Sequence, residues 1–189
     1  MTIFAQYFGK RIYLKTYLTP HFYMISVEID ALTNSIQNRI TGEVFETEIL
    51  ELTAHELNSV KDWQFNWLKE SRYFKIYKLI TVADPAVIQG LMSIEKRGGY
   101  VYMSLLENAP LNVGKEKIYS GVAANLVAYA CKYSFDCKFE GFVNFVSKSQ
   151  LVEHYQKMLG AKIIFARNMI IEKDAATKLV NQYFKNYFK

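Results

Sequence analysis

The feature that most constrains the fold is a change of hydrophobic period in the second half of the chain. Residues 139–146 form a short, almost wholly apolar run, which is typical of a strand covered on both faces. Before this run, apolar residues from Gly121 onward recur on one helical face, whereas residues 100–106 follow a strand pattern. The order strand, helix, strand predicts a sheet with helices packed on it.

The remaining patterns extend this sheet in both directions along the chain. Thr53 followed by Glu56 resembles a capping box that opens a helix running to Leu68, and Gly98-Gly99 fits the turn of a hairpin. The fold class predicted is therefore α/β (α+β), with a single mixed, mostly antiparallel sheet flanked by helices. Further strands are expected over residues 11–17, 23–29, 43–50, 73–82, 87–95, 163–165 and 169–171, and further helices over 149–160 and about 175–188.

Composition narrows the class of protein. With 189 residues, 51% hydrophobic and 22% charged, the chain has the size and balance of one globular domain, which excludes disorder as its main description. The net charge of +5 comes from singly spaced basic residues while residues 25–70 are acidic, so no nucleic-acid partner is expected. No stretch of 18 uncharged apolar residues occurs, and Lys10 and Arg11 interrupt the apolar N-terminus, so neither a membrane partner nor secretion is expected.

Cysteine and histidine are too sparse to build a structural or metal framework. Two cysteines cannot form a disulfide network of the secreted type, which indicates a cytoplasmic protein with reduced thiols. Three scattered histidines without a cysteine at ligand spacing predict no metal site. The residues concerned are Cys131, Cys137, His21, His55 and His154.

Small residues at the start of the expected second-half helix form a candidate anion site. Small side chains let a ligand approach the backbone, and the free N–H groups of a helix start attract anions together with the helix dipole. Lys115 and Lys117 add positive charge, so a pyrophosphate fits this environment. An ordinary helix-start glycine explains the first of these residues equally well. The residues concerned are Gly121, Val122, Ala123, Ala124 and Asn125.

Two motifs follow one another between residues 73 and 172. Gly121-Val122-Ala123 opens one helix, and Tyr155-Gln156-Lys157 precedes Gly160-Ala161 at the end of the next. In this order the chain resembles the GNAT superfamily of acyl-CoA-dependent N-acetyltransferases. Its members show a strand, a loop of the form Gln/Arg-x-x-Gly-x-Gly/Ala, a helix, a further strand, and a helix with Tyr-x-Lys near a closing Gly-Phe. Here Ile118 replaces the Gln or Arg, and alanine replaces the phenylalanine.

The resemblance implies a single domain over residues 1–189. Residues 73–172 would form the acyl-CoA-binding core, residues 1–72 unfamiliar elements on the acceptor side, and residues 173–189 a C-terminal helix. It also implies that two neighbouring parallel strands, 100–106 and 139–146, splay apart so that the pantetheine arm of the donor inserts between them.

The resemblance further implies how acetyl-CoA, as the acyl donor, would be held. Backbone groups around Leu105 and Leu106 would pair with the pantetheine amides like an added strand. The amide N–H groups of residues 122–125 would hold the pyrophosphate, with Lys117 beside them.

The resemblance also implies catalytic roles. Tyr155 would lie near the thioester sulfur and give a proton to the departing thiolate, and Glu107 would remove a proton from the amine, with Glu95 as a substitute base. His154 is expected to point to a different face of the helix from Tyr155. An ordinary core tyrosine and a solvated turn carboxylate are the alternatives for Tyr155 and Glu107.

Two other functions stay open at this stage. Ile118 and Ala161 also fit a catalytically inactive module of the same fold that binds acyl-CoA or a protein partner. The third hypothesis is an unrelated interaction protein whose aromatic C-terminal helix contacts a partner. That helix is expected to pack on its own sheet, with a homodimer contact second and a membrane surface third. Its apolar face comprises Leu179, Val180, Tyr183, Phe184, Tyr187 and Phe188.

The acceptor of the acyl group is expected to be a small-molecule or peptide amine. An acidic surplus in the N-terminal third would attract a cationic amine such as a polyamine, a lysine side chain or an aminoglycoside. A solvated strand face explains the same carboxylates. These carboxylates are Glu43, Glu46, Glu48 and Glu51.

Overall fold

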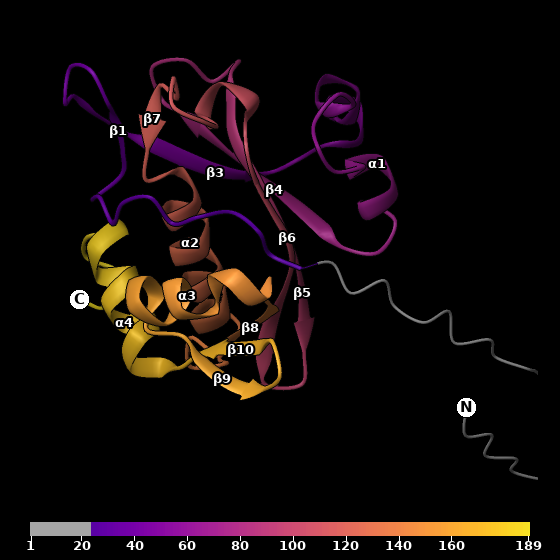
Figure 1. The fold of residues 1–189 in the computed structure, drawn as a ribbon, viewed down its shortest axis with the longest axis vertical. Helices are drawn as coiled ribbons and strands as arrows, with labels where there is room; N and C mark the ends of the chain where they lie inside the picture. Colours follow the sequence, from indigo (N-terminus) through magenta and orange to yellow (C-terminus); the bar gives the residue numbers. More distant parts are fainter. Residues whose placement is uncertain (1–23) are drawn as a thin grey trace, which may run out of the picture.

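One seven-stranded sheet dominates the computed structural model, which describes residues 24–189; the strand predicted over 11–17 lies outside them. The strands are β3 (Thr47–Glu51), β4 (Lys75–Thr81), β5 (Ile88–Arg97), β6 (Tyr100–Asn108), β8 (Val143–Val146), β9 (Lys162–Phe165) and β10 (Asn168–Ile171). Their order is β3-β4-β5-β6-β8-β10-β9 (Figure 1). All neighbours are antiparallel except β6 and β8, which are parallel. The mixed, mostly antiparallel sheet predicted from the sequence is confirmed.

A second, small sheet joins the N-terminal part of the described chain to its middle. It consists of β1 (Ile36–Asn38), β2 (Val44–Phe45) and β7 (Tyr119–Ser120), with β1 in the centre. Gln37 lies opposite Ser120, so the residues that follow Asp30 are held directly beside the start of the next helix.

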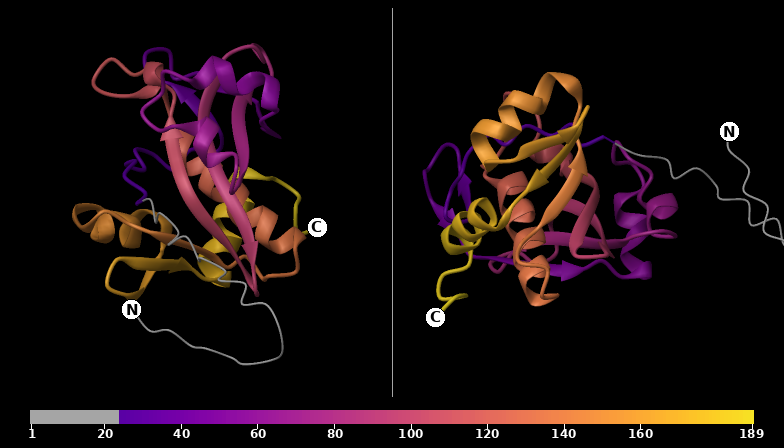
Figure 2. Two further views of the ribbon diagram at one scale, coloured as in Figure 1. Left: turned by 90° about the vertical axis from the view of Figure 1, so that its right-hand side faces the viewer. Right: turned by 90° about the horizontal axis from the view of Figure 1, so that it is seen from below.

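Helices cover both faces of the main sheet. One face carries the short helices η1 (Ala54–Val60) and α1 (Trp67–Glu70), and the other carries α2 (Val122–Asp136), α3 (Val152–Leu159) and α4 (Lys173–Tyr183) (Figures 1 and 2). Two further 3₁₀ turns, η2 (Pro110–Asn112) and η3 (Ser149–Leu151), lie in the connections.

Each face of the sheet has its own apolar core because side chains alternate along a strand. On β4, Ile76 belongs to the smaller core under η1 and α1, whereas Tyr77 and Leu79 belong to the larger core under α2 to α4. The predicted C-terminal helix packs inside the chain, since Leu179 and Val180 of α4 are buried in the larger core.

Several predicted boundaries are wrong, for local reasons. The strand over 43–50 is divided into β2 and β3, and the helix from Thr53 to Leu68 is a 3₁₀ helix and a single α turn. The apolar run 139–146 contributes a strand only from Val143, because Lys138, Glu140 and Gly141 adopt positive φ and form a turn.

Of the strand predicted over 23–29, the described part makes one bridge, between Ile25 and Ser147. The last helix runs from Lys173 to Tyr183 and not over 175–188.

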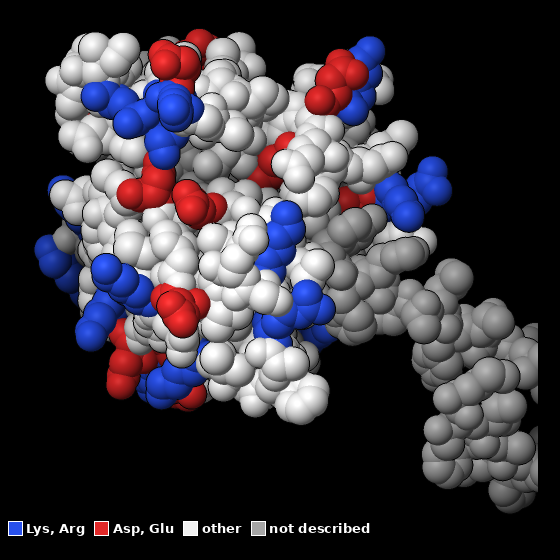
Figure 3. Space-filling view, in the orientation of Figure 1, with Lys and Arg blue, Asp and Glu red and all other residues white. Residues whose placement is uncertain are grey.

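Charged side chains of both signs are interspersed on the face shown in Figure 3. None of the helices formed by residues 24–189 combines the length and the apolar character that crossing a bilayer requires.

Candidate active site

The strands β6 and β8 are paired at one end and separate at the other. Only Val101–Val143 and Tyr102–Asn144 are opposed in the parallel register, although β6 continues to Asn108 and β8 to Val146. The sheet therefore opens between the C-terminal halves of these two strands.

A bulge in β6 accompanies this opening. Ser93 of β5 lies opposite Leu105 and Ile94 lies opposite Met103, so Ser104 is an extra residue in β6. An extra residue bends its strand and increases the local twist, which turns the end of β6 away from β8. The Ser93 hydroxyl accepts the Leu105 N–H at 3.0 Å and donates to Glu70 at 2.6 Å, so a buried polar chain holds the bulge.

Two parallel strands that part beside a crossover helix are what the sequence resemblance implies. The described chain has the mixed sheet and the single parallel strand pair that the resemblance to the GNAT superfamily implies.

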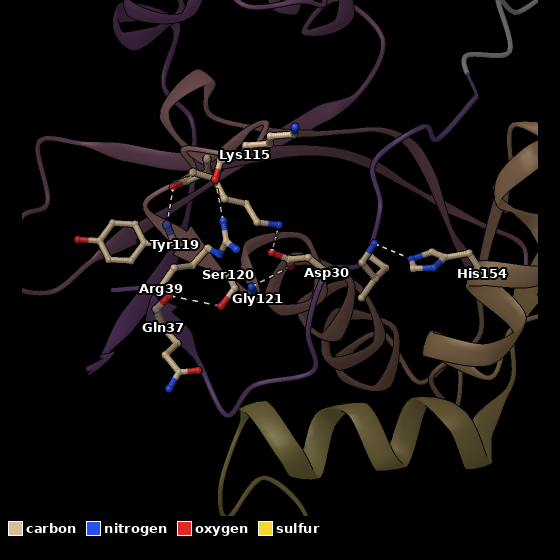
Figure 4. A network of polar contacts seen from close by, with 11 residues as sticks. Asp30, Gln37, Arg39, Lys115, Tyr119, Ser120, Gly121 and His154 are labelled. Atoms are coloured by element: carbon tan, nitrogen blue, oxygen red, sulfur yellow. Dashed lines mark hydrogen bonds and ion pairs between the residues drawn. The ribbon is translucent and has the colours of Figure 1, made fainter. Parts of the chain in front are cut away.

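Helix α2 begins at the open end of the strand pair. Gly121 is its N-cap with φ +82°, and a Cβ there would overlap the Thr33 hydroxyl and come within 2.9 Å of the Ser35 carbonyl oxygen. Glycine is thus required by both conformation and space. The Gly121 N–H donates to Asp30 Oδ1 at 3.0 Å, and Lys117 Nζ pairs with Asp30 Oδ2 at 2.8 Å (Figure 4).

The other residues predicted to hold the pyrophosphate follow in the first turn of α2. Val122, Ala123 and Ala124 are buried, so their side chains belong to the larger core. The Asn125 N–H donates to the Gly121 carbonyl within the helix, and its side-chain amide donates to Thr47 Oγ1 at 2.9 Å. Asn125 therefore connects α2 to the edge strand β3.

Tyr155 of α3 points towards the open end of the strand pair. Its side chain is fully buried, its ring contacts Phe145 edge to face at 5.4 Å, and its hydroxyl donates to the Val27 carbonyl at 2.6 Å. Burial raises the pKa of Tyr155, which keeps its hydroxyl protonated at neutral pH. His154 contacts the same segment at a different residue, since its Nε2 accepts the Ile29 N–H at 2.9 Å.

Leu105 and Leu106 are both buried, on opposite faces of the sheet. Leu105 belongs to the smaller core and Leu106 to the larger one. Their side chains anchor the end of β6.

Glu107 has a position that the sequence did not indicate. Only 5% of its surface is exposed, and its carboxylate accepts the N–H groups of Gln64 at 2.7 Å and Phe65 at 3.3 Å and the indole N–H of Trp67 at 2.7 Å. It is therefore an anchor for the segment that leads into α1, rather than a solvated turn carboxylate. The substitute base Glu95 lies opposite Tyr102, at the paired end of β6, and bonds Arg97.

A cavity of about 730 Å³ lies beside these groups. Its walls come from residues 26–28 and Asp30, from the loop after β6 with Asn112 and Lys117, and from Gln64 with Glu107. Leu105, Leu106 and Tyr155 are not among its lining residues. The structure thus brings Lys117 and Glu107 to one cavity, with the N-terminal segment forming the wall towards Tyr155.

Comparison with protein-family models and with curated proteins finds no match. Among solved structures, the chain is similar to a mutant of the toxin AtaT bound to the C-terminus of the antitoxin AtaR, with TM-score 0.48 and 15% identity over 72% of this chain and 98% of that chain. It is similar to AtaTR bound with AcCoA at TM-score 0.48 and 13% identity, over 71% and 98% of the two chains. It is also similar to spermidine N-acetyltransferase from Vibrio cholerae in complex with CoA and spermine, at TM-score 0.47 and 14% identity, over 70% and 98%.

Sequence reasoning missed Asp30, the residue that joins the N-terminal segment to this site. No motif surrounds it, and its partners Lys117 and Gly121 are about ninety residues away in the chain. The one relevant signal was the prediction that the start of α2 binds an anion, because in the structure the Asp30 carboxylate is the anionic group at that position.

Proposed function

We propose that this protein is an N-acyltransferase that moves an acetyl group from acetyl-CoA to a primary amine. The observation that supports this most strongly is the opening between β6 and β8 next to the start of α2. In this proposal the backbone of Leu105 and Leu106 faces the pantetheine, and Lys117 with the first amides of α2 faces the diphosphate.

The proposed reaction is direct attack of the amine on the thioester. The C–N bond forms, the C–S bond breaks, and the Tyr155 hydroxyl gives its proton to the departing thiolate. A backbone N–H of the splayed strand stabilises the negative charge on the carbonyl oxygen. Tyr155 is the candidate for this role because its hydroxyl donates a hydrogen bond to Val27 at the open end of the strand pair.

The amine must lose a proton before it attacks. The Glu107 carboxylate already accepts three hydrogen bonds, from the backbone N–H groups of Gln64 and Phe65 and from the indole N–H of Trp67, so both of its oxygens are engaged by the protein. We therefore assign Glu107 to positioning the wall formed by Gln64 and Phe65, and assign removal of the proton to water in the cavity.

A second candidate function is a module of the same fold without catalysis. Residues 25–30 contact the groups proposed to hold the donor, which favours this candidate. Ile118 adds to it, because its exposed apolar side chain supplies no charge to a diphosphate.

Thermal unfolding with acetyl-CoA tests the proposal. A ligand that binds only the native state raises the melting temperature, by about 2–4 °C for each kcal/mol of binding in a chain of this size. We expect a larger rise with acetyl-CoA than with ADP at the same concentration, because ADP carries the diphosphate but not the pantetheine. A panel of polyamines, lysine peptides and aminoglycosides, followed by release of free thiol, then identifies the acceptor.

Tyr155→Phe separates the two candidate functions. We expect turnover to fall by about 100-fold or more while acetyl-CoA still binds. Tyr183→Phe is the matched control, because its hydroxyl also bonds the N-terminal part of the chain, at the Thr33 N–H, but lies on α4. Binding without any turnover in the wild type would instead support the inactive module.

A further inference from the structure

Residues 25–30, called the strap below, lie along the open end of the β6–β8 pair. The strap pairs with the end of β8, because the Ile25 N–H donates to the Val146 carbonyl at 2.7 Å and the Ile25 carbonyl accepts the Lys148 N–H at 3.0 Å. It adds a short parallel pairing to β8 at the point where β6 has separated from it.

The polar contacts of the strap coincide with the groups proposed to hold the donor. At one point the Val27 carbonyl accepts the Tyr155 hydroxyl, which is proposed to face the sulfur. Three residues later the Asp30 carboxylate takes the Gly121 N–H and Lys117, which are proposed to face the diphosphate (Figure 4). A carboxylate is the protein group closest in chemistry to a phosphate oxygen at a helix start.

The apolar contacts hold the strap in this position. Ile25 and Ile29 each have 1% of their surface exposed and belong to the larger core. His154 Nε2 accepts the N–H of Ile29, which directly precedes Asp30, and so fixes the backbone at this point. The strap is thus a packed part of the fold whose polar groups satisfy donors that a nucleotide would otherwise use.

We propose that the strap is an autoinhibitory element that must leave the open end of the β6–β8 pair before acetyl-CoA binds. This inference depends on the proposed function. When the binding-competent form is only a fraction of the molecules, the apparent dissociation constant rises by the inverse of that fraction. Wild-type protein therefore binds CoA weakly, and loosening the strap tightens binding.

Asp30→Asn in the full chain tests this by calorimetry with CoA. The variant loses the charge pair with Lys117, and we expect the dissociation constant to fall by about tenfold or more. Glu28→Gln is the matched control: it removes the same charge from the strap, and its carboxylate forms no hydrogen bond or ion pair with any of residues 24–189. Less than about threefold tightening is expected for it, since an exposed charge acts on the anionic ligand only weakly. Equal tightening by both variants would overturn the inference in favour of general electrostatics.

A reversible disulfide provides the second test. Ile25 and Ser147 are bridge partners on adjacent strands, so Ile25→Cys with Ser147→Cys, in a Cys137→Ser background, meets the distance a disulfide needs. We expect the oxidised protein to lose CoA binding and the reduced protein to regain it, with Ile25→Cys alone as the control for the lost side chain. Binding that is equal in both redox states overturns the strap inference and leaves the proposed function intact. Absence of binding in every variant, Asp30→Asn included, overturns both.

Discussion

The two ends of the β6–β8 pair are built in different ways. At the closed end, Val101 and Tyr102 face Val143 and Asn144 in a regular parallel register, so the backbone itself holds the strands together. At the open end the strands are held apart, and a packed tyrosine, a glycine N-cap and the strap occupy the surroundings. The backbone ladder orders the closed end, whereas the open end is ordered by side-chain contacts of Asp30 and Tyr155.

The largest expected effect is the loss of stability when packing at the open end is removed. Phe145 is fully buried at the open end and supports Tyr155, so Phe145→Ala is expected to lower the free energy of unfolding by about 3–5 kcal/mol. Phe165→Ala, on the edge strand β9 with 79% of the side chain exposed, is the matched control and is expected to change it by less than about 0.5 kcal/mol. Denaturant unfolding measures the free energy of unfolding of both variants. If the two variants lost similar amounts of stability, the open end would not depend on the Phe145 side chain.

Glu107→Gln is expected to have the next largest effect. An amide in place of the carboxylate leaves at least one of three N–H donors without an acceptor, which lowers the free energy of unfolding by about 1–3 kcal/mol. Glu95→Gln, which alters a partly exposed ion pair with Arg97, is expected to cost about 0.5 kcal/mol or less. Unfolding curves of both variants check this, and KM for the amine is expected to rise more than kcat falls. A large fall in kcat with unchanged stability would instead identify Glu107 as the general base.

Asp30→Asn is expected to lower stability by about 1–2 kcal/mol in the absence of ligand, because it breaks a partly buried pair with Lys117. Thermal unfolding without and with CoA measures the change, and the loss is expected to shrink or reverse when CoA is present. A loss of the same size under both conditions would separate the Asp30 contact from the donor site.

The smallest expected effect concerns Glu56 in η1, away from both ends of the β6–β8 pair, and it depends on pH. The side-chain hydrogen bond from Lys78 lowers the pKa of Glu56 from its ordinary value to about 2. A carboxyl whose folded pKa is depressed stabilises the fold above its unfolded pKa of about 4.5, and this contribution is lost as the pH falls towards 2. Glu56→Gln is therefore expected to cost about 0.5–1 kcal/mol at pH 7 and progressively less below pH 4.5. A difference that persists to pH 2 would contradict this assignment.

Strand and helix order could be predicted from the sequence because it depends on local periodicity and caps. The predicted hairpin around Gly98-Gly99 and the helix that begins after Gly121 are both present. The turn at 138–141 was missed because Phe139 was joined to the apolar residues after Gly141 as one run, whereas Lys138, Glu140 and Gly141 adopt positive φ and end the strand before Val143.

The site could be predicted only in part. The small residues of α2 and Tyr155 carry local signals, but Asp30 and Glu107 acquire their partners through contacts that span 40–91 residues of sequence. No local pattern encodes such contacts, because they depend on how the N-terminal part of the chain crosses the finished sheet.

The most direct test of the central claim, that the open end of the β6–β8 pair is a donor site filled by the strap, is amide hydrogen exchange with and without acetyl-CoA. The amides of Ile25 and Ile29 are bonded to Val146 and His154 in the free protein. With acetyl-CoA bound, we predict faster exchange at these two amides and slower exchange at residues 122–124. Unchanged exchange in both segments at millimolar acetyl-CoA would contradict the claim.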